Sequence, residues 1–235
     1  MDASAYALAH GVRATRRTLS LWRDRPWPIL RSWLLGSLAA AGVLLVAILV
    51  IALVSYGSVT TKLQDQPPLF VGGPSDVAQI LGHNLLVLAL HAMACVAGFI
   101  AGSSLPLQAG EHNGLVRLVH ERGQPVAMGF VVCATTFSLS LQAYAIGTSV
   151  AHVSYALHVP PVLLLIGLLP HAVPELVALF LPLAAWIVAS RRGEWDRLLA
   201  ATIVTVAVAV PTLTLTALWE VYVAPHLLAR LFGWS

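Results

Sequence analysis

Charged residues are scarce in this sequence. Of its 235 residues only 10% are Asp, Glu, Lys or Arg, whereas 58% are hydrophobic, and the mean hydropathy is +0.83. A soluble domain carries about 25% charged residues to cover its surface, but a surface in contact with lipid needs none. The shortage of charge excludes an ordinary soluble domain and predicts an integral membrane protein.

Cysteine and the sequence motifs of soluble enzymes are also scarce. Cys95 and Cys133 lie in separate apolar runs without a CxxC spacing, which predicts two small buried hydrophobic residues and no disulfide. The sequence contains no G-x-S-x-G, P-loop, H-E-x-x-H or G-x-G-x-x-G motif. The chain is therefore not expected to hydrolyse nucleotides by itself. The formal charge of +3 does not predict nucleic-acid binding, because the basic residues follow a membrane pattern.

Long apolar runs fill most of the chain. A membrane-spanning helix needs about 20 apolar residues. We predict an all-α, polytopic membrane helix bundle with about five transmembrane helices and an N-terminal amphipathic helix. The five runs are Trp33 to Tyr56, Asn84 to Leu105, Pro125 to Val150, Pro160 to Ser190 and Leu198 to Val223.

The basic residues predict the topology. Residues 1–32 are interpreted as a basic cytoplasmic segment, and residues 33–235 as the transmembrane domain. The helix over Ala5 to Trp22 would lie on the inner membrane surface, the alternative being a solvated tail. With five crossings and a cytoplasmic N-terminus, eleven arginines lie inside and only Lys62 and Arg230 outside. This bias favours a multi-pass membrane protein with a cytoplasmic N-terminus, with Gly57 to Gly82 as an outer loop.

The fourth run is too long for a simple crossing and contains Pro170, Pro174 and Pro182. Each proline removes a backbone donor from a helix. The run is either one steeply tilted helix or two pieces. We favour a break near Pro170–Pro174, which would give a broken fourth helix with a short re-entrant piece.

Four ionisable residues lie inside the apolar runs: His91, His171, Glu175 and Glu220. Such residues are costly in a membrane and normally face a partner inside the bundle. His171 and Glu175 are four residues apart, on one face of a helix, and are interpreted as a proton-transfer couple. Alternatively, the two residues only hydrogen-bond each other and join helices. A His-x-x-x-Glu pair supplies too few ligands for a closed metal site, so neither a metal nor a cofactor is predicted.

The second run carries small residues at four-residue spacing, Ala94, Gly98 and Gly102. This spacing lets a neighbouring helix backbone approach closely. It predicts helix packing, within the chain or across a homo-oligomer interface.

Several short stretches together resemble the stage II sporulation protein M-like integral membrane family. Pro170-His171-Ala172-Val173-Pro174-Glu175-Leu176 is similar to the family's Pro-His-Gly…Glu-Leu signature, with Ala172 in place of glycine. The other matching stretches are His83-Asn84 at a helix entry (with His83 in place of asparagine), Gly98 with Gly102, Asn113-Gly114 in the following loop, and Trp219-Glu220-Val221-Tyr222-Val223-Ala224-Pro225.

The resemblance implies a membrane subunit that works with partner proteins. In that family such subunits act as scaffolds in cell-wall remodelling or accompany the maturation of bacteriocins and linaridin-type modified peptides. We therefore expect a subunit of a peptide-maturation complex that binds a hydrophobic peptide and a second membrane protein. His171, Glu175, His91 and Glu220 are the candidate catalytic residues for dehydration or epimerisation. The candidate substrate-binding or helix-packing residues are Asn84, Gly98, Gly102, Asn113, Pro170 and Pro174. The alternative function is export, immunity or a non-catalytic morphogenetic scaffold.

Overall fold

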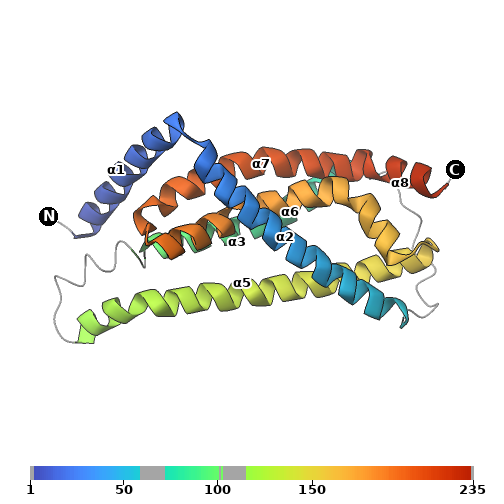
Figure 1. The fold of residues 1–235 in the computed structure, drawn as a ribbon, viewed down its shortest axis with the longest axis horizontal. Helices are drawn as coiled ribbons and strands as arrows, with labels where there is room; N and C mark the ends of the chain where they lie inside the picture. Colours follow the sequence, from blue (N-terminus) through green and yellow to red (C-terminus); the bar gives the residue numbers. More distant parts are fainter. Residues whose placement is uncertain (1–2, 59–71, 101, 103–114, 234–235) are drawn as a thin grey trace. The chain divides into compact units, whose positions relative to one another are not determined.

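The structure of the chain is a computed structural model that describes residues 3–58, 72–100, 102 and 115–233, with the backbone alone at residues 3–10 and 115–127. The described part is helical and contains no β-strand (Figure 1). Its elements are α1 (Ala3–Asp24), α2 (Trp27–Tyr56), α3 (Pro74–Phe99), α5 (Leu115–Ala156), α6 (Pro161–Arg192), the 3₁₀-helix η3 (Trp195–Arg197), α7 (Leu198–Tyr222) and α8 (Ala224–Phe232).

Five segments of the described chain are long and apolar enough to cross a membrane. They are Trp27–Tyr56, Pro74–Phe99, Met128–Ala156, Pro161–Arg192 and Trp195–Tyr222. The predicted all-α fold with five spanning helices is confirmed. The chain is a multi-pass membrane protein.

The second spanning helix begins ten residues earlier than predicted, at Pro74 instead of Asn84. The predicted outer loop, Gly57 to Gly82, is therefore wrong in its last third. The Gly73 backbone N–H donates to the Asp76 carboxylate at 2.7 Å, and the backbone N–H groups of Asp76 and Val77 donate to the Gly73 carbonyl. A helix start is favoured by a proline at the first helical position, here Pro74, and by an acidic side chain in the first turn, here Asp76, that accepts a hydrogen bond from the residue before the helix. The glycine–proline pair opens the helix instead of forming a free loop.

The fourth spanning segment, α6, is one continuous helix over 32 residues. The expected break near Pro170–Pro174 into a re-entrant piece and a crossing is not observed. Instead the helix bends in its first half, where Figure 1 changes from yellow to orange. Each proline removes one backbone N–H, and helices kink at such positions without ending.

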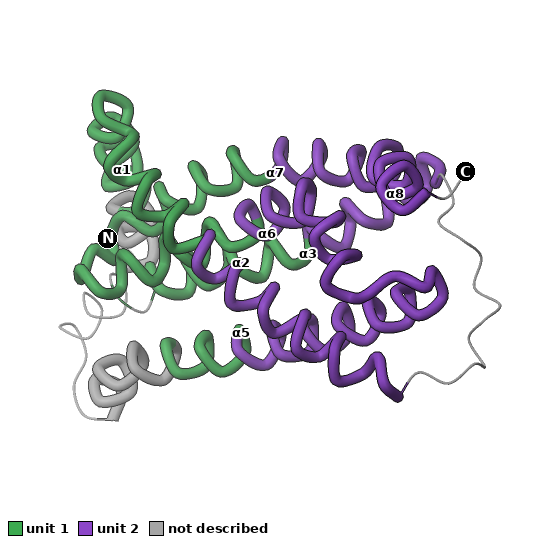
Figure 2. Tube along the Cα trace, turned by 45° about the vertical axis from the view of Figure 1, so that its right-hand side comes forward, with its two compact units in different colours: residues 1–37, 86–135, 179–209 green, residues 38–85, 136–178, 210–235 purple. Residues whose placement is uncertain are grey.

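The described chain divides into two compact units, coloured separately in Figure 2. Unit 1 contains residues 1–37, 86–135 and 179–209, and unit 2 contains residues 38–85, 136–178 and 210–235. Each of the five long helices contributes one end to each unit, and the end that belongs to unit 1 alternates along the chain.

Unit 1 has an apolar core built from four buried residues of three helices: Trp33, Leu181, Ala185 and Ala201. The Trp22 ring of α1 meets the Trp33 ring edge-on, with centroids 5.2 Å apart. This contact ties the end of α1 to the core, and large aromatic rings contribute much of such packing energy.

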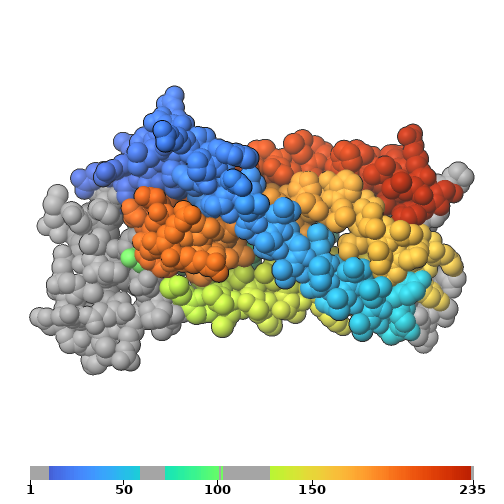
Figure 3. All heavy atoms as spheres, in the orientation of Figure 1, coloured from blue at the N-terminus to red at the C-terminus, as the bar shows by residue number. Residues whose placement is uncertain are grey.

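Helix α1 packs within unit 1 from Gly11 onward, where its side chains are described. A Cβ added at Gly11 would lie 3.0 Å from the Phe99 ring, so glycine permits a close approach to α3. Thr15 and Thr18 are buried. Helix α1 also contacts η3, and Figure 3 shows the dark-blue helix directly beside the orange segment that contains η3. The helix predicted over Ala5 to Trp22 is present as α1 (Ala3–Asp24).

Unit 2 has its own close helix contacts. A Cβ at Gly147 of α5 would lie 2.7 Å from the Ile51 side chain of α2, and a Cβ at Gly167 of α6 would lie 2.5 Å from Leu228 of α8. Glycine at both positions lets the helix axes approach closely.

Candidate functional site

A cluster of polar side chains lies in the apolar interior of unit 2. Asn84 comes from α3, His171 and Glu175 from α6, and Glu220 from the end of α7. Asn84 and His171 are buried, with 5% and 6% of their surface exposed, and both glutamates are partly buried. Polar groups at this depth normally need partners in the protein, so their contacts indicate what the cluster can do.

Asn84 and Glu175 join α3 to α6 through a direct hydrogen bond. The Asn84 side-chain amide donates to the Glu175 Oε1 at 3.0 Å. The bond occupies one oxygen of the Glu175 carboxyl group, and the other oxygen can accept a hydrogen bond from a further donor. The sequence singled out both residues but did not predict that they bond to each other. The two residues are 91 positions apart in the chain, so their contact depends on how α3 packs against α6.

Glu220 brings α7 to the same cluster. Its carboxyl group interacts electrostatically with that of Glu175. Two negative charges close together in a low-dielectric interior repel each other strongly. A pair of carboxyl groups in such a position can hold and exchange one proton between them.

His171 lies one helical turn before Glu175 on α6. Its Nδ1 is buried and has no hydrogen-bond partner among the described residues. The two residues are four positions apart in one continuous helix, and the hydrogen bond of the Glu175 carboxyl is made to Asn84. A buried ring nitrogen without a partner in the protein is a group that can bind a donor or an acceptor from a substrate.

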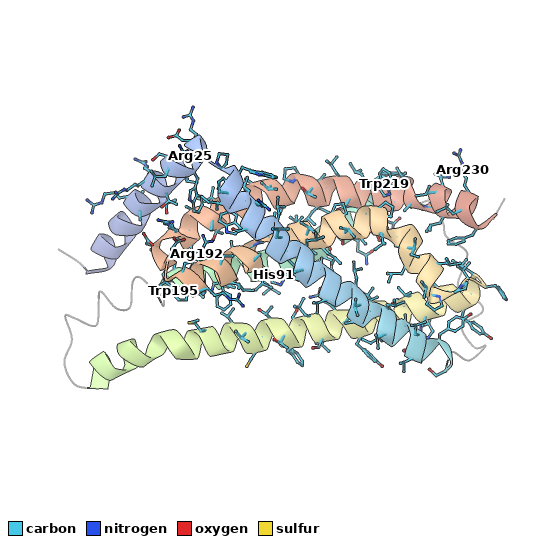
Figure 4. The ribbon with its side chains drawn as sticks, viewed as in Figure 1. Arg25, His91, Arg192, Trp195, Trp219 and Arg230 are labelled. Atoms are coloured by element: carbon cyan, nitrogen blue, oxygen red, sulfur yellow. The ribbon has the colours of Figure 1, made fainter. Side chains whose placement is uncertain are left out.

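His91 belongs to unit 1, not to this cluster. Its Nδ1 lies 2.8 Å from the Leu179 carbonyl oxygen, and its ring packs beside Phe180 with centroids 5.6 Å apart. A carbonyl only accepts, so Nδ1 carries the proton and donates. His91, marked in Figure 4, thus ties α3 to α6 inside unit 1.

The glycines of the second apolar run pack within unit 1. A Cβ at Gly98 would lie 2.8 Å from both Leu198 and Trp186, and a Cβ at Gly102 would run into the ring of Trp195, which is also labelled in Figure 4. These glycines therefore pack inside one chain.

The two cysteines differ. Cys95 is buried, as predicted, and its thiol donates to the Pro182 carbonyl at 3.1 Å, whereas Cys133 is exposed on α5, against the prediction. An apolar sequence context marks a residue as membrane-embedded but does not distinguish the lipid side from the protein side. Pro170 and Pro174 are exposed on α6, and Asn113 lies outside the described residues.

Helix α5 is the least buried of the spanning helices. In its most apolar stretch of 18 residues only 6% is buried, against 28–39% in the corresponding stretches of the other four helices. Its mean hydropathy is nevertheless the lowest of the five. Hydroxyl groups such as Ser140 and Thr148 donate to carbonyls of their own helix. A helix left to face lipid alone would be expected to be the most apolar one.

Comparison of the chain with models of protein families, with curated proteins and with solved structures gives no match. Functional inference therefore starts from the polar cluster of unit 2 (Asn84, His171, Glu175 and Glu220) and from the exposed helix α5.

Proposed function

We propose that the chain is a subunit of a membrane complex that handles a hydrophobic peptide and takes part in its maturation. The observation that carries the proposal is the polar cluster of unit 2. It places a hydrogen-bonded amide, two interacting carboxyl groups and a buried ring nitrogen that has no partner among the described residues in an apolar surrounding. Such groups can bind the backbone of a peptide and move protons on it, while the apolar surrounding accepts its side chains.

The charges of the units support a cytoplasmic N-terminus in a bacterial plasma membrane. The described side chains of unit 1 include nine arginines and three carboxylates, whereas those of unit 2 include one arginine and three carboxylates. Since each long helix has one end in each unit, the arginine-rich ends all belong to unit 1. The positive-inside rule then assigns the ends in unit 1 to the cytoplasm.

The exposed face of α5 supports a second membrane protein as partner. This helix combines the smallest buried share with the lowest hydropathy of the five. Contact with another helix bundle, or with a second copy of the chain, would cover its hydroxyl and amide groups. We propose α5 as the main assembly surface.

The chemistry that fits the cluster is proton abstraction at a peptide α-carbon. In a dehydration, a base takes the Cα proton of Ser or Thr, the Cα–H electron pair forms the Cα=Cβ bond, and the hydroxyl leaves as water after receiving a proton. In an epimerisation, a second group returns a proton to the opposite face. We propose His171 as the base and the Glu175–Glu220 pair as the proton store. His91 is proposed only as a positioning residue, because its Nδ1 is bound to Leu179.

The proposed family is the stage II sporulation protein M-like one. The alternative function, export, immunity or cell-wall scaffolding, uses the same fold. The main support for export was a break in the fourth spanning helix, and α6 is continuous. Peptide maturation is preferred because it gives the polar cluster of unit 2 a role.

The decisive experiment purifies the tagged chain from its native membrane and identifies bound proteins and peptides by mass spectrometry, for the wild type and for His171→Ala. We expect a hydrophobic peptide whose mass has changed by one water, or whose residue stereochemistry is inverted, with the wild type. The variant should retain the partner and carry the unmodified peptide.

His152→Ala is the matched control, because His152 is a partly buried histidine of unit 2 outside the cluster. If His171→Ala loses the partner or the folded protein while the control keeps both, His171 is structural. A peptide of unchanged mass that the purified chain moves across vesicles would establish export, and co-purified cell-wall hydrolases would establish a scaffold.

A further inference from the structure

Two apolar grooves lie along one face of α1 in unit 1. The larger, of about 590 Å³, is lined by Val12, Thr15, Arg16 and Leu19 of α1 together with Phe99 and the first turns of α7. The smaller, of about 210 Å³, is lined by α1, the start of α2 and Val204. Leu19 lines both, so the grooves lie on either side of this one side chain.

Each groove has a single charged residue in its lining, an arginine of α1. Arg16 belongs to the larger groove and Arg23 to the smaller one. The two are seven residues apart, which places them on the same side of the helix at a distance of roughly 10 Å along its axis. Thr15, which precedes Arg16 in α1 and also lines the larger groove, donates its hydroxyl hydrogen to the Gly11 carbonyl. That hydroxyl hydrogen is therefore already used within the helix.

The surroundings of the grooves have the composition of a membrane interface. Leu21 and Trp27 are exposed to 60% and 64%, and in the sequence they flank Arg23 and Arg25. Asp24 is the only carboxylate among the described residues of α1. Exposed tryptophan and leucine beside arginine are typical of the level of lipid headgroups. Figure 4 shows the Arg25 side chain extending away from the ribbon.

We propose that unit 1 binds one anionic phospholipid along α1, with its acyl chains in the two grooves and its phosphate held by Arg16 and Arg23. Charge decides the occupant: the described side chains of unit 1 have six more positive than negative groups (nine arginines minus three carboxylates). A net negative headgroup is attracted by this field, whereas the choline group of a zwitterionic lipid is not. The grooves are apolar and accept hydrocarbon. The lipid would fix α1 to the membrane and to α7.

The test is a native mass spectrometry titration of the purified, delipidated chain. Phosphatidylglycerol is compared with phosphatidylcholine of the same acyl chains. We expect one phosphatidylglycerol to be retained preferentially. Replacing both arginines, in Arg16→Gln/Arg23→Gln, should weaken its binding about 25-fold, since each basic residue near a lipid surface contributes about a fivefold factor.

The matched control is Arg17→Gln/Arg25→Gln, which removes the same charge from two arginines that, like Arg16 and Arg23, are exposed but line neither groove. It should change binding less than about threefold, because a charge away from the bound phosphate is screened by the solution. A second pair tests the grooves: Ile203→Trp fills the larger one, whereas Leu215→Trp adds the same bulk at an exposed position of α7 outside it. Only Ile203→Trp should reduce lipid retention, with thermal unfolding showing that both variants remain folded.

Three results would overturn the proposal. Equal losses in the two arginine pairs would show a diffuse charge effect instead of a site. Equal retention of both lipids would remove the role of headgroup charge. If the mass bound to the chain were that of a second copy or of a peptide, and the groove variant removed it, the grooves would be a protein contact.

Discussion

The substitution Gly98→Ala tests whether α3 packs in unit 1 as described. The added Cβ would lie 2.8 Å from Leu198 Cδ1, 2.8 Å from Trp186 Nε1 and 2.9 Å from Trp186 Cδ1. Neither neighbour can move aside easily, because Leu198 is fully buried and Trp186 is 5% exposed. Forcing an extra carbon into a filled core costs about 1–3 kcal/mol. We expect a loss of that size in the free energy of unfolding.

Gly42→Ala is the matched control on another spanning helix. No described atom lies within 4 Å of a Cβ at Gly42, which is exposed on α2. Alanine there should stabilise the protein by roughly 0.5–1 kcal/mol, because glycine loses more conformational entropy in a helix. The two variants, each adding one methyl group, should therefore differ by about 1.5–4 kcal/mol.

The assay is unfolding in mixed detergent micelles with increasing dodecyl sulfate, followed by tryptophan fluorescence. Adding Trp186→Phe to Gly98→Ala should recover part of the loss, with a coupling energy of about 0.5–3 kcal/mol, as expected for residues in contact. If Gly98→Ala is as stable as Gly42→Ala, or if the double variant shows no coupling, α3 does not pack against Trp186 and the description of unit 1 fails.

Three further predictions concern single contacts. Asn84→Leu should lower the free energy of unfolding by about 1–3 kcal/mol, since it leaves the Glu175 carboxyl unpaired; the same substitution in a Glu175→Leu background should cost less, and an unchanged cost would refute the pairing. In detergent, a hydrophobic maleimide should label Cys133 in the folded protein and Cys95 only after unfolding, as peptide mapping would show; early labelling of Cys95 would contradict its burial. Gly147→Ala should destabilise unit 2 by about 1–3 kcal/mol because the Cβ would meet the side chain and backbone of α2, and detergent unfolding with Gly42→Ala as reference measures it.

The sequence by itself determined the class of the protein and the number of its spanning helices. Hydrophobicity over about 20 residues is a property of the chain alone, because the bilayer acts on each segment before any packing. For the same reason the ends of α7 could be placed within one residue, Leu198–Tyr222 against the expected Leu198 to Val223. The start of α3 was missed, since proline and glycine serve both to open a helix and to form a turn.

The tertiary structure decided which polar residues act together. Periodicity places His171 and Glu175 on one face of α6, but whether Glu175 bonds its own neighbour or Asn84 of another helix depends on how α3 and α6 meet. Likewise, hydropathy identified Cys95 and Cys133 as membrane-embedded, and only packing separated the buried thiol from the exposed one. Lipid and protein interior are equally apolar, so the sequence of a membrane helix determines its depth, while the contacts between helices determine which of its side chains meet.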